Sequence, residues 1–497
     1  MTPKADLGRR TLAALVWTYA GAVGRVLLQL VFQLLLARLL GPEAFGQASL
    51  ALIVLGFGWI LSEAGFGSAL IQKSEISAQD IRFALGWVLL ASVLAGACIA
   101  LAAPWCARWL GDAHAWPLLA AAGALIPIQA VSNIPSSLMR RNLDAKRAQA
   151  MYLTGYAVAY GAVGLPSAWL GAGPWALIAA FGVHSLFGLV VGCWITRCPL
   201  RPSLRGDGGL RSFGLKVTLA NMANWATENV DRMLVSRFWG SAALGAYGAA
   251  ANLSRAPAGF LLGSLQSVAF ASAARLQDSR DRLASVFLGM VAGVSLFTWP
   301  IFVAMAVHAD LIISLLYGHR WSDAGPLFAI FSLALLPMTL LGVAGPLLWA
   351  INAVGADLQG QLLTVVLLLA GLWFFSALPL HQAAWVVLPA YLARSLWQTA
   401  RLAQALGVSL MHVLRALRGG LLLTCLAGLL AWQSQRLPQT WAVLLVTVVV
   451  GLPVWLVLLR WQARFLLGPL AGLLQEHATR VPALKRLCRL LKLEVVC

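Results

Sequence analysis

The sequence predicts an all-α polytopic membrane protein with about 14 transmembrane helices, arranged as two pseudo-symmetric six-helix lobes followed by two C-terminal helices. The first observation behind this prediction is composition: 60% of the 497 residues are apolar and only 11% are charged. Ordinary soluble domains carry roughly 25% charged residues, so this chain cannot cover a water-facing surface. The other two observations are a series of long apolar runs and an internal repeat.

The apolar runs approach the ~20 residues that a helix needs to cross the hydrocarbon core of a bilayer. Fourteen candidate spans cover residues 11–36, 45–61, 83–104, 116–134, 151–170, 175–195, 212–238, 244–271, 283–307, 327–350, 362–378, 384–402, 416–432 and 441–459. Between them lie short connections, so the chain leaves little room for a large domain outside the membrane.

Lys and Arg are concentrated in the even-numbered connections and in both tails, for example at Arg140 and Arg141. The odd-numbered connections carry few, among them Arg38 and Arg237. Because positive residues gather in cytoplasmic loops, both termini are expected in the cytoplasm. The same rule explains the net charge of +19, and no basic stretch accompanies a nucleic-acid-binding signature, so nucleic acid is not an expected partner.

The internal repeat joins ARLLGPEAFGQASLA (37–51) to SRFWGSAALGAYGAA (236–250). Without gaps, the alignment places Arg38 on Arg237, Gly41 on Gly240, Ala44 on Ala243, Gly46 on Gly245 and Ala51 on Ala250. Six expected spans separate the copies, so both run in the same direction, as in parallel repeats related by an axis along the membrane normal. A binding site is expected where the two lobes meet.

The repeat divides the chain into three predicted parts. They are an N-lobe with spans one to six (1–205), a C-lobe with spans seven to twelve (206–407), and residues 408–497 with the last two spans and a cytoplasmic tail. Within the tail, segment 480–496 alternates basic residues and leucines at helical spacing, which predicts an amphipathic helix on the membrane surface.

Charged side chains lie inside the seventh predicted span. Asn221, Asn224, Glu228 and Asp231 share one helical face, and Arg232 lies roughly 100° away from it. Each charge costs about 2.5–3.5 kcal/mol at the bilayer centre on insertion scales. The face is therefore expected to line a water-filled cavity or to contact another helix.

Two interpretations of this face stay open. Glu228 precedes Arg232 by four residues, the order that favours a local and purely structural ion pair. Asp231 then has no local partner, and Asp231 with Glu228 forms the predicted ion-coupling site, since a desolvated carboxylate can bind and release a proton or a cation. Coupling to a proton or sodium gradient is thus an option. No metal site or other cofactor is expected, because the seven cysteines form no CxxC pair and no histidine cluster accompanies them.

The first span carries a matching polar face, and two more arginines lie deep in later spans. Guanidinium groups bind phosphate through parallel hydrogen bonds and stay protonated when desolvated, and amide side chains can bind sugar hydroxyls. The predicted substrate-binding residues are Arg25, Gln29, Gln33, Asn221, Asn224, Glu228, Arg232, Arg255 and Arg394. Pairing of the deep arginines with Asp231 or Glu228 is the alternative.

Four stretches, FQLLLARLLGPEAFG (32–46), LSEAGFGSALIQKSEIS (61–77), NVDRMLVSRFWGSAALGAYGAA (229–250) and LLYGHRWSDAGPLFAIFSL (315–333), carry a family resemblance. Together they resemble polysaccharide-exporting flippases of the multidrug/oligosaccharidyl-lipid/polysaccharide (MOP) superfamily, over about residues 10 to 400. The resemblance implies alternating access between two lobes, and an undecaprenyl-pyrophosphate-linked oligosaccharide as the substrate. It also implies a bacterial inner membrane with polymerase and export machinery as neighbours, and pyrophosphate binding by Arg25 and Arg255.

Other classes of protein remain alternatives. A multidrug antiporter of the same superfamily would have twelve spans and a cavity for organic cations, which fits deep arginines poorly. A membrane polysaccharide polymerase or ligase would need catalytic groups in a large external loop, but the longest one, 308–327, is short and has no nucleotide-sugar motif. A structural partner in an export complex is a third. The sequence favours a transporter over an enzyme, and no catalytic residue is predicted.

Overall fold

The computed structural model describes residues 3–63, 65–73, 75–199, 201–205, 209–276, 279–436, 441–461 and a few positions between 466 and 475. All regular elements in these residues are helices, which confirms the predicted fold class. Eight of the described helices are long and apolar enough to cross a membrane. The count of fourteen spans stays a prediction, and the expected tail helix at 480–496 lies outside the described residues.

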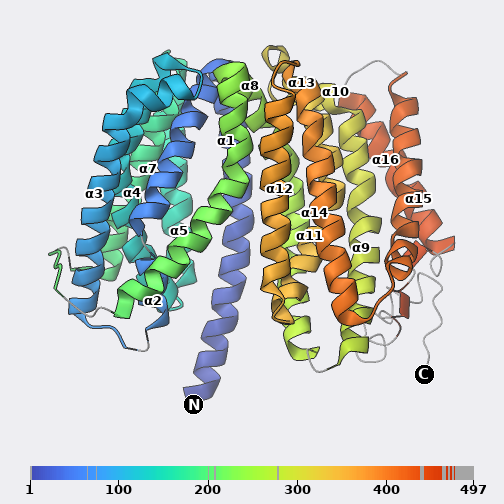
Figure 1. Ribbon diagram of the computed structural model, residues 1–497, viewed down its shortest axis with the longest axis horizontal. Coiled ribbons are helices and arrows are strands. Elements are labelled where there is room, and N and C mark those ends of the chain that lie inside the picture. The colour runs from blue at the N-terminus through green and yellow to red at the C-terminus, as the bar shows by residue number, and fades with distance from the viewer. Residues whose placement is uncertain are drawn as a thin grey trace. The chain divides into compact units, whose positions relative to one another are not determined.

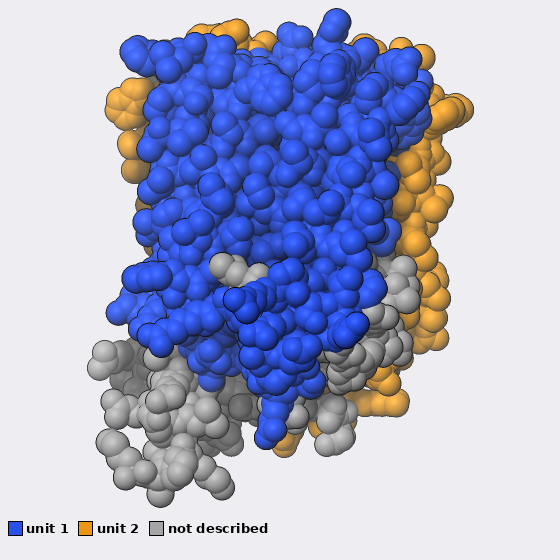
Figure 2. All heavy atoms as spheres, turned by 90° about the vertical axis from the view of Figure 1, so that its left-hand side faces the viewer, with its two compact units in different colours: residues 1–248 blue, residues 249–497 orange. Residues whose placement is uncertain are grey.

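The chain forms two compact units, Met1–Gly248 and Ala249–Cys497, which Figure 2 distinguishes by colour. The helices of the first unit are α1 (Pro3–Glu63), α2 (Phe66–Gln72), α3 (Ala78–Trp109), η1 (Ala113–Ala115), α4 (Trp116–Arg141), α5 (Ala145–Tyr156), the π-helical η2 (Ala157–Gly164), α6 (Leu165–Trp169), α7 (Trp175–Thr196) and the first part of α8 (Gly209–Leu276). The predicted lobe boundaries at 205 and 407 stay predictions.

The second unit contains the rest of α8 and a second set of helices, in which α12 and α14 lie side by side (Figure 1). They are α9 (Arg280–Val307), α10 (Ala309–Leu316), η3 (His319–Trp321), α11 (Ala324–Ala350), α12 (Val354–Phe374), α13 (Leu380–Ala383), η4 (Ala384–Val386), α14 (Val387–Leu406), α15 (Leu410–Ser434) and α16 (Trp441–Trp461).

The long helices α1 and α8 each break at a glycine of the sequence repeat. Gly41 has φ 76° and ψ 173°, and Gly240 has φ 84° and ψ 179°. This part of conformational space is accessible almost only to glycine. Both breaks fall between expected spans, one between the first and second and the other between the seventh and eighth. The two copies of the repeat therefore adopt the same turn.

Beyond these breaks, the two copies of the repeat cross inside the first unit at very short range. A Cβ atom on Gly46 would overlap the carbonyl oxygen of Ser241, and a Cβ atom on Gly245 would overlap that of Pro42. Because Pro42 and Ser241 occupy the same place in the repeat, each copy presents a carbonyl group to the glycine of the other. Small residues allow membrane helices to approach this closely, so the two glycines define the crossing.

Helix α12 differs from the expected eleventh span. It begins at Val354 and ends at Phe374, earlier at both ends than the predicted 362–378. The predicted span therefore did not include Asp357 and Gln361. In the structure both are helical, and Asp357 is buried among hydrogen-bond donors.

We expect Gly46→Ala to lower the unfolding temperature of the purified protein. The added methyl group must displace the Ser241 carbonyl, and overpacking of this kind costs about 1–3 kcal/mol. Gly248→Ala is the matched control on α8, because a Cβ atom there meets nothing within 4 Å. Equal unfolding temperatures for Gly46→Ala and the wild type would show that the crossing does not constrain the fold.

Candidate functional site

The polar face of α1 packs against α5 inside the first unit. The Arg25 Nη2 donates to Gln149 Oε1 at 3.3 Å, and its guanidinium carbon lies 3.9 Å from the centre of the Tyr152 ring. The Gln29 side-chain amide donates to the Tyr152 hydroxyl at 2.9 Å. The structure thus brings two of the predicted residues together around one tyrosine.

Arg25 has only neutral partners among the residues that the structure describes. Its Nε is buried and makes no hydrogen bond, and the same holds for the Gln33 side-chain nitrogen. A buried donor without an acceptor costs about 1–3 kcal/mol, and a stacked tyrosine stabilises the cation without neutralising it. This part of α1 therefore keeps a positive charge and free donors, which suits an anionic ligand.

A stack of tyrosines holds the Arg25 site in place. Tyr152 stacks on Tyr156 with ring centres 6.1 Å apart, and Tyr156 on Tyr160 at 4.1 Å. The His184 ring meets the first two edge-on, at 4.9 and 5.6 Å. The last tyrosine lies in the π-helical η2, and such wide turns are frequent at functional sites. The stack fixes the ring on which Arg25 lies.

The polar face of the seventh span divides in the structure. Asp231 is only 3% exposed, and it accepts hydrogen bonds from the Tyr247 hydroxyl at 2.8 Å and from the backbone N–H of Arg232 at 2.8 Å. Glu228 and Asn221 are exposed, whereas the Asn224 side chain lies outside the described part of the chain. Asp231 is therefore satisfied by neutral donors, and its ion-coupling role stays a prediction.

Arg394 lies in a buried network between α12 and α14 of the second unit. Its Nη2 is 3.4 Å from Asp357 Oδ1, and the two side chains are 15% and 8% exposed. Asp357 also accepts hydrogen bonds from Gln398 at 2.6 Å, Trp349 at 2.9 Å and Gln361 at 3.1 Å. Arg394 thus pairs with an acid that the sequence analysis placed in a loop, and its substrate-binding role stays a prediction.

Asp112 joins the two copies of the repeat within the first unit. Its Oδ2 accepts hydrogen bonds from the Ser241 hydroxyl at 2.5 Å and from the Gln47 amide at 2.9 Å. Burial raises the pKa of this carboxyl, but the hydrogen bonds from Ser241 and Gln47 and from the backbone of His114 and Ala115 lower it further, so the pKa lies below its ordinary value. An ionised Asp112 therefore bridges α1 and α8 next to their crossing.

For two other predicted residues, Arg255 and Arg232, the structure gives the degree of burial. Arg255, in the part of α8 that belongs to the second unit, is half-buried, and so is Arg232 in the first unit. Within the described residues, no group of three or more His, Cys, Asp or Glu side chains gathers as metal ligands would.

A family model described as "Polysaccharide biosynthesis protein" matches residues 35–326, more than half of the chain. The chain belongs to this polysaccharide biosynthesis protein family. The match contains Asp112, Asp231 and Arg255, whereas Arg25 and Arg394 lie outside it. The resemblance drawn from the four sequence stretches is thereby confirmed.

Two relatives in the family have names that describe polysaccharide or lipopolysaccharide synthesis. The succinoglycan biosynthesis transport protein ExoT of Rhizobium meliloti is 26% identical over 322 residues, which cover 64% of this chain and 65% of ExoT. The lipopolysaccharide biosynthesis protein WzxC of Escherichia coli is 24% identical over 358 residues, 69% of this chain and 71% of WzxC. The chain thus spans slightly less than two thirds of the length of ExoT.

Solved structures show that this family member has the MOP superfamily fold. The lipid II flippase MurJ in an inward closed conformation matches with a TM-score of 0.68 at 13% identity, covering 90% of this chain and 97% of MurJ. An inward-facing multidrug resistance MATE transporter of the MOP superfamily matches with a TM-score of 0.58 at 16% identity, covering 76% and 95%. One is named as a flippase and the other as a transporter, and ExoT is named as a transport protein.

Three residues at these sites were missed by the sequence analysis. Tyr152 had a signal, since Tyr152, Tyr156 and Tyr160 recur every four residues and so share one helical face. Asp357 was missed because it lies just before the predicted eleventh span, and Asp112 because it lies in a short connection between two predicted spans. The contacts of Asp112 with Ser241 and of Asp357 with Arg394 join positions that are distant in sequence, so no local pattern could reveal them.

We expect Asp112→Asn to destabilise this family member at pH 7 by about 1 kcal/mol, because a partly exposed charge makes screened hydrogen bonds. The pKa of Asp112 is lowered, so its contribution is present above the ordinary carboxyl pKa of about 4 and is lost as the pH falls further. The difference from the wild type should therefore shrink below about pH 4. Unfolding temperatures measured across this range test the expectation.

The matched control is Asp281→Asn, an exposed acid in the first turn of α9. Its unfolding temperature should follow that of the wild type at each pH. An Asp112→Asn variant as stable as the wild type at pH 7 would contradict the bridging role.

Proposed function

We propose that the protein is a flippase that moves an undecaprenyl-pyrophosphate-linked oligosaccharide across the bacterial inner membrane during exopolysaccharide or lipopolysaccharide synthesis. The observation that carries the proposal is the family match over residues 35–326, together with relatives named for succinoglycan transport and lipopolysaccharide biosynthesis. The fold shared with a lipid II flippase supports it, since it spans 90% of this chain.

The chemistry of Arg25 supports a pyrophosphate ligand. Its guanidinium group is held flat on Tyr152, its described partners are neutral, and its Nε is a buried donor without an acceptor. Guanidinium–phosphate hydrogen bonds are among the strong, charge-assisted ones. A phosphate oxygen bound here would satisfy the buried Nε donor of Arg25.

The glycine breaks in α1 and α8 support alternating access. Hinges are a few residues that absorb large changes in φ and ψ, and Gly41 and Gly240 already occupy conformations that other residues avoid. In this proposal, the crossing at Gly46 and Gly245 closes one side of the transporter. The Asp112 bridge holds that crossing and opens when the transporter changes conformation.

Asp231 is the proposed coupling residue. It is buried on α8, within the predicted seventh span, and its described hydrogen bonds come from a tyrosine hydroxyl and a backbone amide. Moving one charge across the membrane field changes the free energy by about 2.3 kcal/mol per 100 mV, enough to bias a cycle. A proton or sodium gradient could act through this group. Polymerase and export machinery are the proposed neighbours in the cell.

A multidrug antiporter is the second candidate, because a MATE transporter shares the fold. Such a protein would bind organic cations, and an arginine with neutral partners opposes this. A dye-efflux assay in cells separates the two, since a flippase for anionic lipids should confer no efflux of cationic dyes.

We expect Arg25→Ala to reduce polymer export by roughly 10–100-fold in a cell that depends on this protein, which corresponds to the loss of charge-assisted hydrogen bonds worth about 1.5–3 kcal/mol. Lipid-linked repeat units should accumulate in the inner leaflet while the protein level is unchanged. Arg255→Ala should behave in the same way. Secreted polymer and extracted lipid-linked sugars are the two measurements.

The control is Arg108→Ala, because Arg108 is exposed and, among the described residues, its side chain bonds only the Pro104 carbonyl four residues away. It should export normally. Normal export by both Arg25→Ala and Arg255→Ala would show that these arginines do not form the anion site.

We expect Asp231→Asn to make transport insensitive to the ion gradient. The measurement is the flipping rate in vesicles with and without a proton or sodium gradient. Tyr247→Phe is the matched control, since it removes the 2.8 Å hydrogen bond but leaves the Asp231 carboxylate in place. If Asp231→Asn keeps the gradient dependence of the wild type, another group couples transport to the ion.

A further inference from the structure

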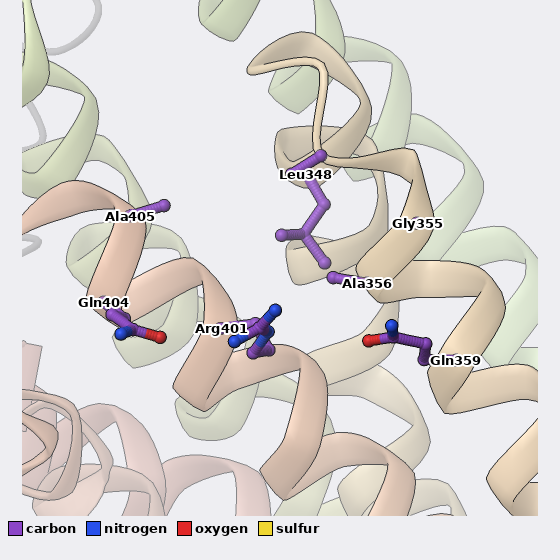
Figure 3. Close-up of a pocket in the computed structure, with 8 residues that line it drawn as sticks. Leu348, Gly355, Ala356, Gln359, Arg401, Gln404 and Ala405 are labelled. Atoms are coloured by element: carbon purple, nitrogen blue, oxygen red, sulfur yellow. The ribbon is translucent and has the colours of Figure 1, made fainter.

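A cavity of about 380 Å³ lies in the second unit, between the turn that joins α11 to α12 and the last turns of α14. Figure 3 shows that Arg401 and Gln359 extend toward each other from opposite walls, with Gln404 beside Arg401 on α14. Leu348 and Ala356 provide apolar surface on the α11 and α12 side. The cavity thus combines one cation, two amides and an apolar wall.

The three polar side chains are not used by the fold. Across the part of the chain that the structure describes, the side chains of Arg401, Gln359 and Gln404 are exposed and make no hydrogen bond or ion pair, and the Arg401 guanidinium lies over the Trp397 ring at 5.4 Å. The nearby acid, Asp357, is buried and held by Arg394 and three neutral donors. No described carboxylate therefore balances the charge of Arg401, and the cavity suits an anion.

The surroundings of the cavity favour a lipid over a soluble ion. On the same two helices, Leu358, Leu362 and Leu396 are 48%, 55% and 62% exposed. Trp349 and Trp397 are also exposed, at 54% and 38%. Of these two helices, α12 is apolar and long enough to cross a membrane, and tryptophans concentrate at the depth of the lipid headgroups. A polar cavity beside exposed leucines and tryptophans is the arrangement that a headgroup and its hydrocarbon chains would require.

We propose that this cavity binds the phosphate group of an anionic membrane phospholipid. Arg401 supplies the charge and a planar set of donors that matches phosphate oxygens, and the amides of Gln359 and Gln404 donate from the two walls. The acyl chains lie along the exposed leucines of α12 and α14. The site belongs to the second unit alone and does not depend on the proposed flippase activity.

Lipid binding to the full-length protein in a neutral detergent tests the proposal. Native mass spectrometry and unfolding temperature would be measured with phosphatidylglycerol, with zwitterionic phosphatidylcholine, and with inorganic phosphate. The wild type should prefer phosphatidylglycerol, and Arg401→Gln should weaken that binding roughly tenfold or more, as expected for the loss of one charge-assisted contact.

Two further variants distinguish lipid binding in the cavity from general attraction to a positive charge. Gly355→Leu fills the cavity but keeps Arg401, and a Cβ atom at Gly355 meets nothing within 4 Å, so this variant should fold and lose the preference. Arg436→Gln should keep it, because Arg436 lies over Trp432 at the same 5.4 Å but outside the cavity.

The outcomes are decisive in each direction. If both Arg401→Gln and Gly355→Leu bind phosphatidylglycerol with wild-type affinity, the proposed site is overturned. If Arg436→Gln loses as much of the preference for phosphatidylglycerol as Arg401→Gln, the lipid is held by general charge attraction and the proposed site is overturned. Stabilisation by inorganic phosphate that matches phosphatidylglycerol and depends on Arg401 overturns the lipid as occupant and assigns a soluble anion.

Discussion

The close backbone contact between the two copies of the repeat is the constraint on which the first unit depends. Gly41 and Gly240 turn the chain, and Gly46 and Gly245 then let α1 and α8 cross with their backbones in contact. This crossing sets where the neighbouring polar groups lie. Asp112 reaches both helices only because they meet here, and Tyr247 reaches Asp231 from the segment just beyond it.

Two of the deep arginines, Arg25 and Arg394, differ in how their charge is balanced. Arg394 pairs with the buried Asp357 carboxylate, so its charge has a fixed counter-ion, although its Nε, like that of Arg25, is buried without a hydrogen-bond partner. Arg25 faces a glutamine and a tyrosine ring, and both are neutral. A cation in a membrane protein that lacks a fixed counter-ion is costly, and a transported anion would offset this cost. Arg401 differs from Arg394 in the same way, because Arg394 pairs with Asp357 whereas no described carboxylate pairs with Arg401.

Periodicity and composition predicted much of the fold, but few of the contacts between polar side chains. The apolar runs indicated an all-helical membrane protein, the repeat aligned the two glycines at which α1 and α8 break, and four-residue spacing placed Arg25 and Gln29 on one face. Sequence could not show that Asp112 meets Ser241, or that Asp357 meets Arg394, because these contacts join positions distant in the chain. The predicted eleventh span also began later than α12, so it left out Asp357, which its partners satisfy inside the folded protein.

Flipping of a defined lipid-linked oligosaccharide by the purified protein tests the central claim most directly. The protein would be reconstituted in vesicles that carry a polyprenyl-pyrophosphate oligosaccharide, and the fraction of sugar exposed on the outer leaflet would be followed over time. Protein-dependent movement of this lipid, but not of one with the pyrophosphate removed, is the predicted result. No movement above that in protein-free vesicles, for a range of oligosaccharides, would contradict the account.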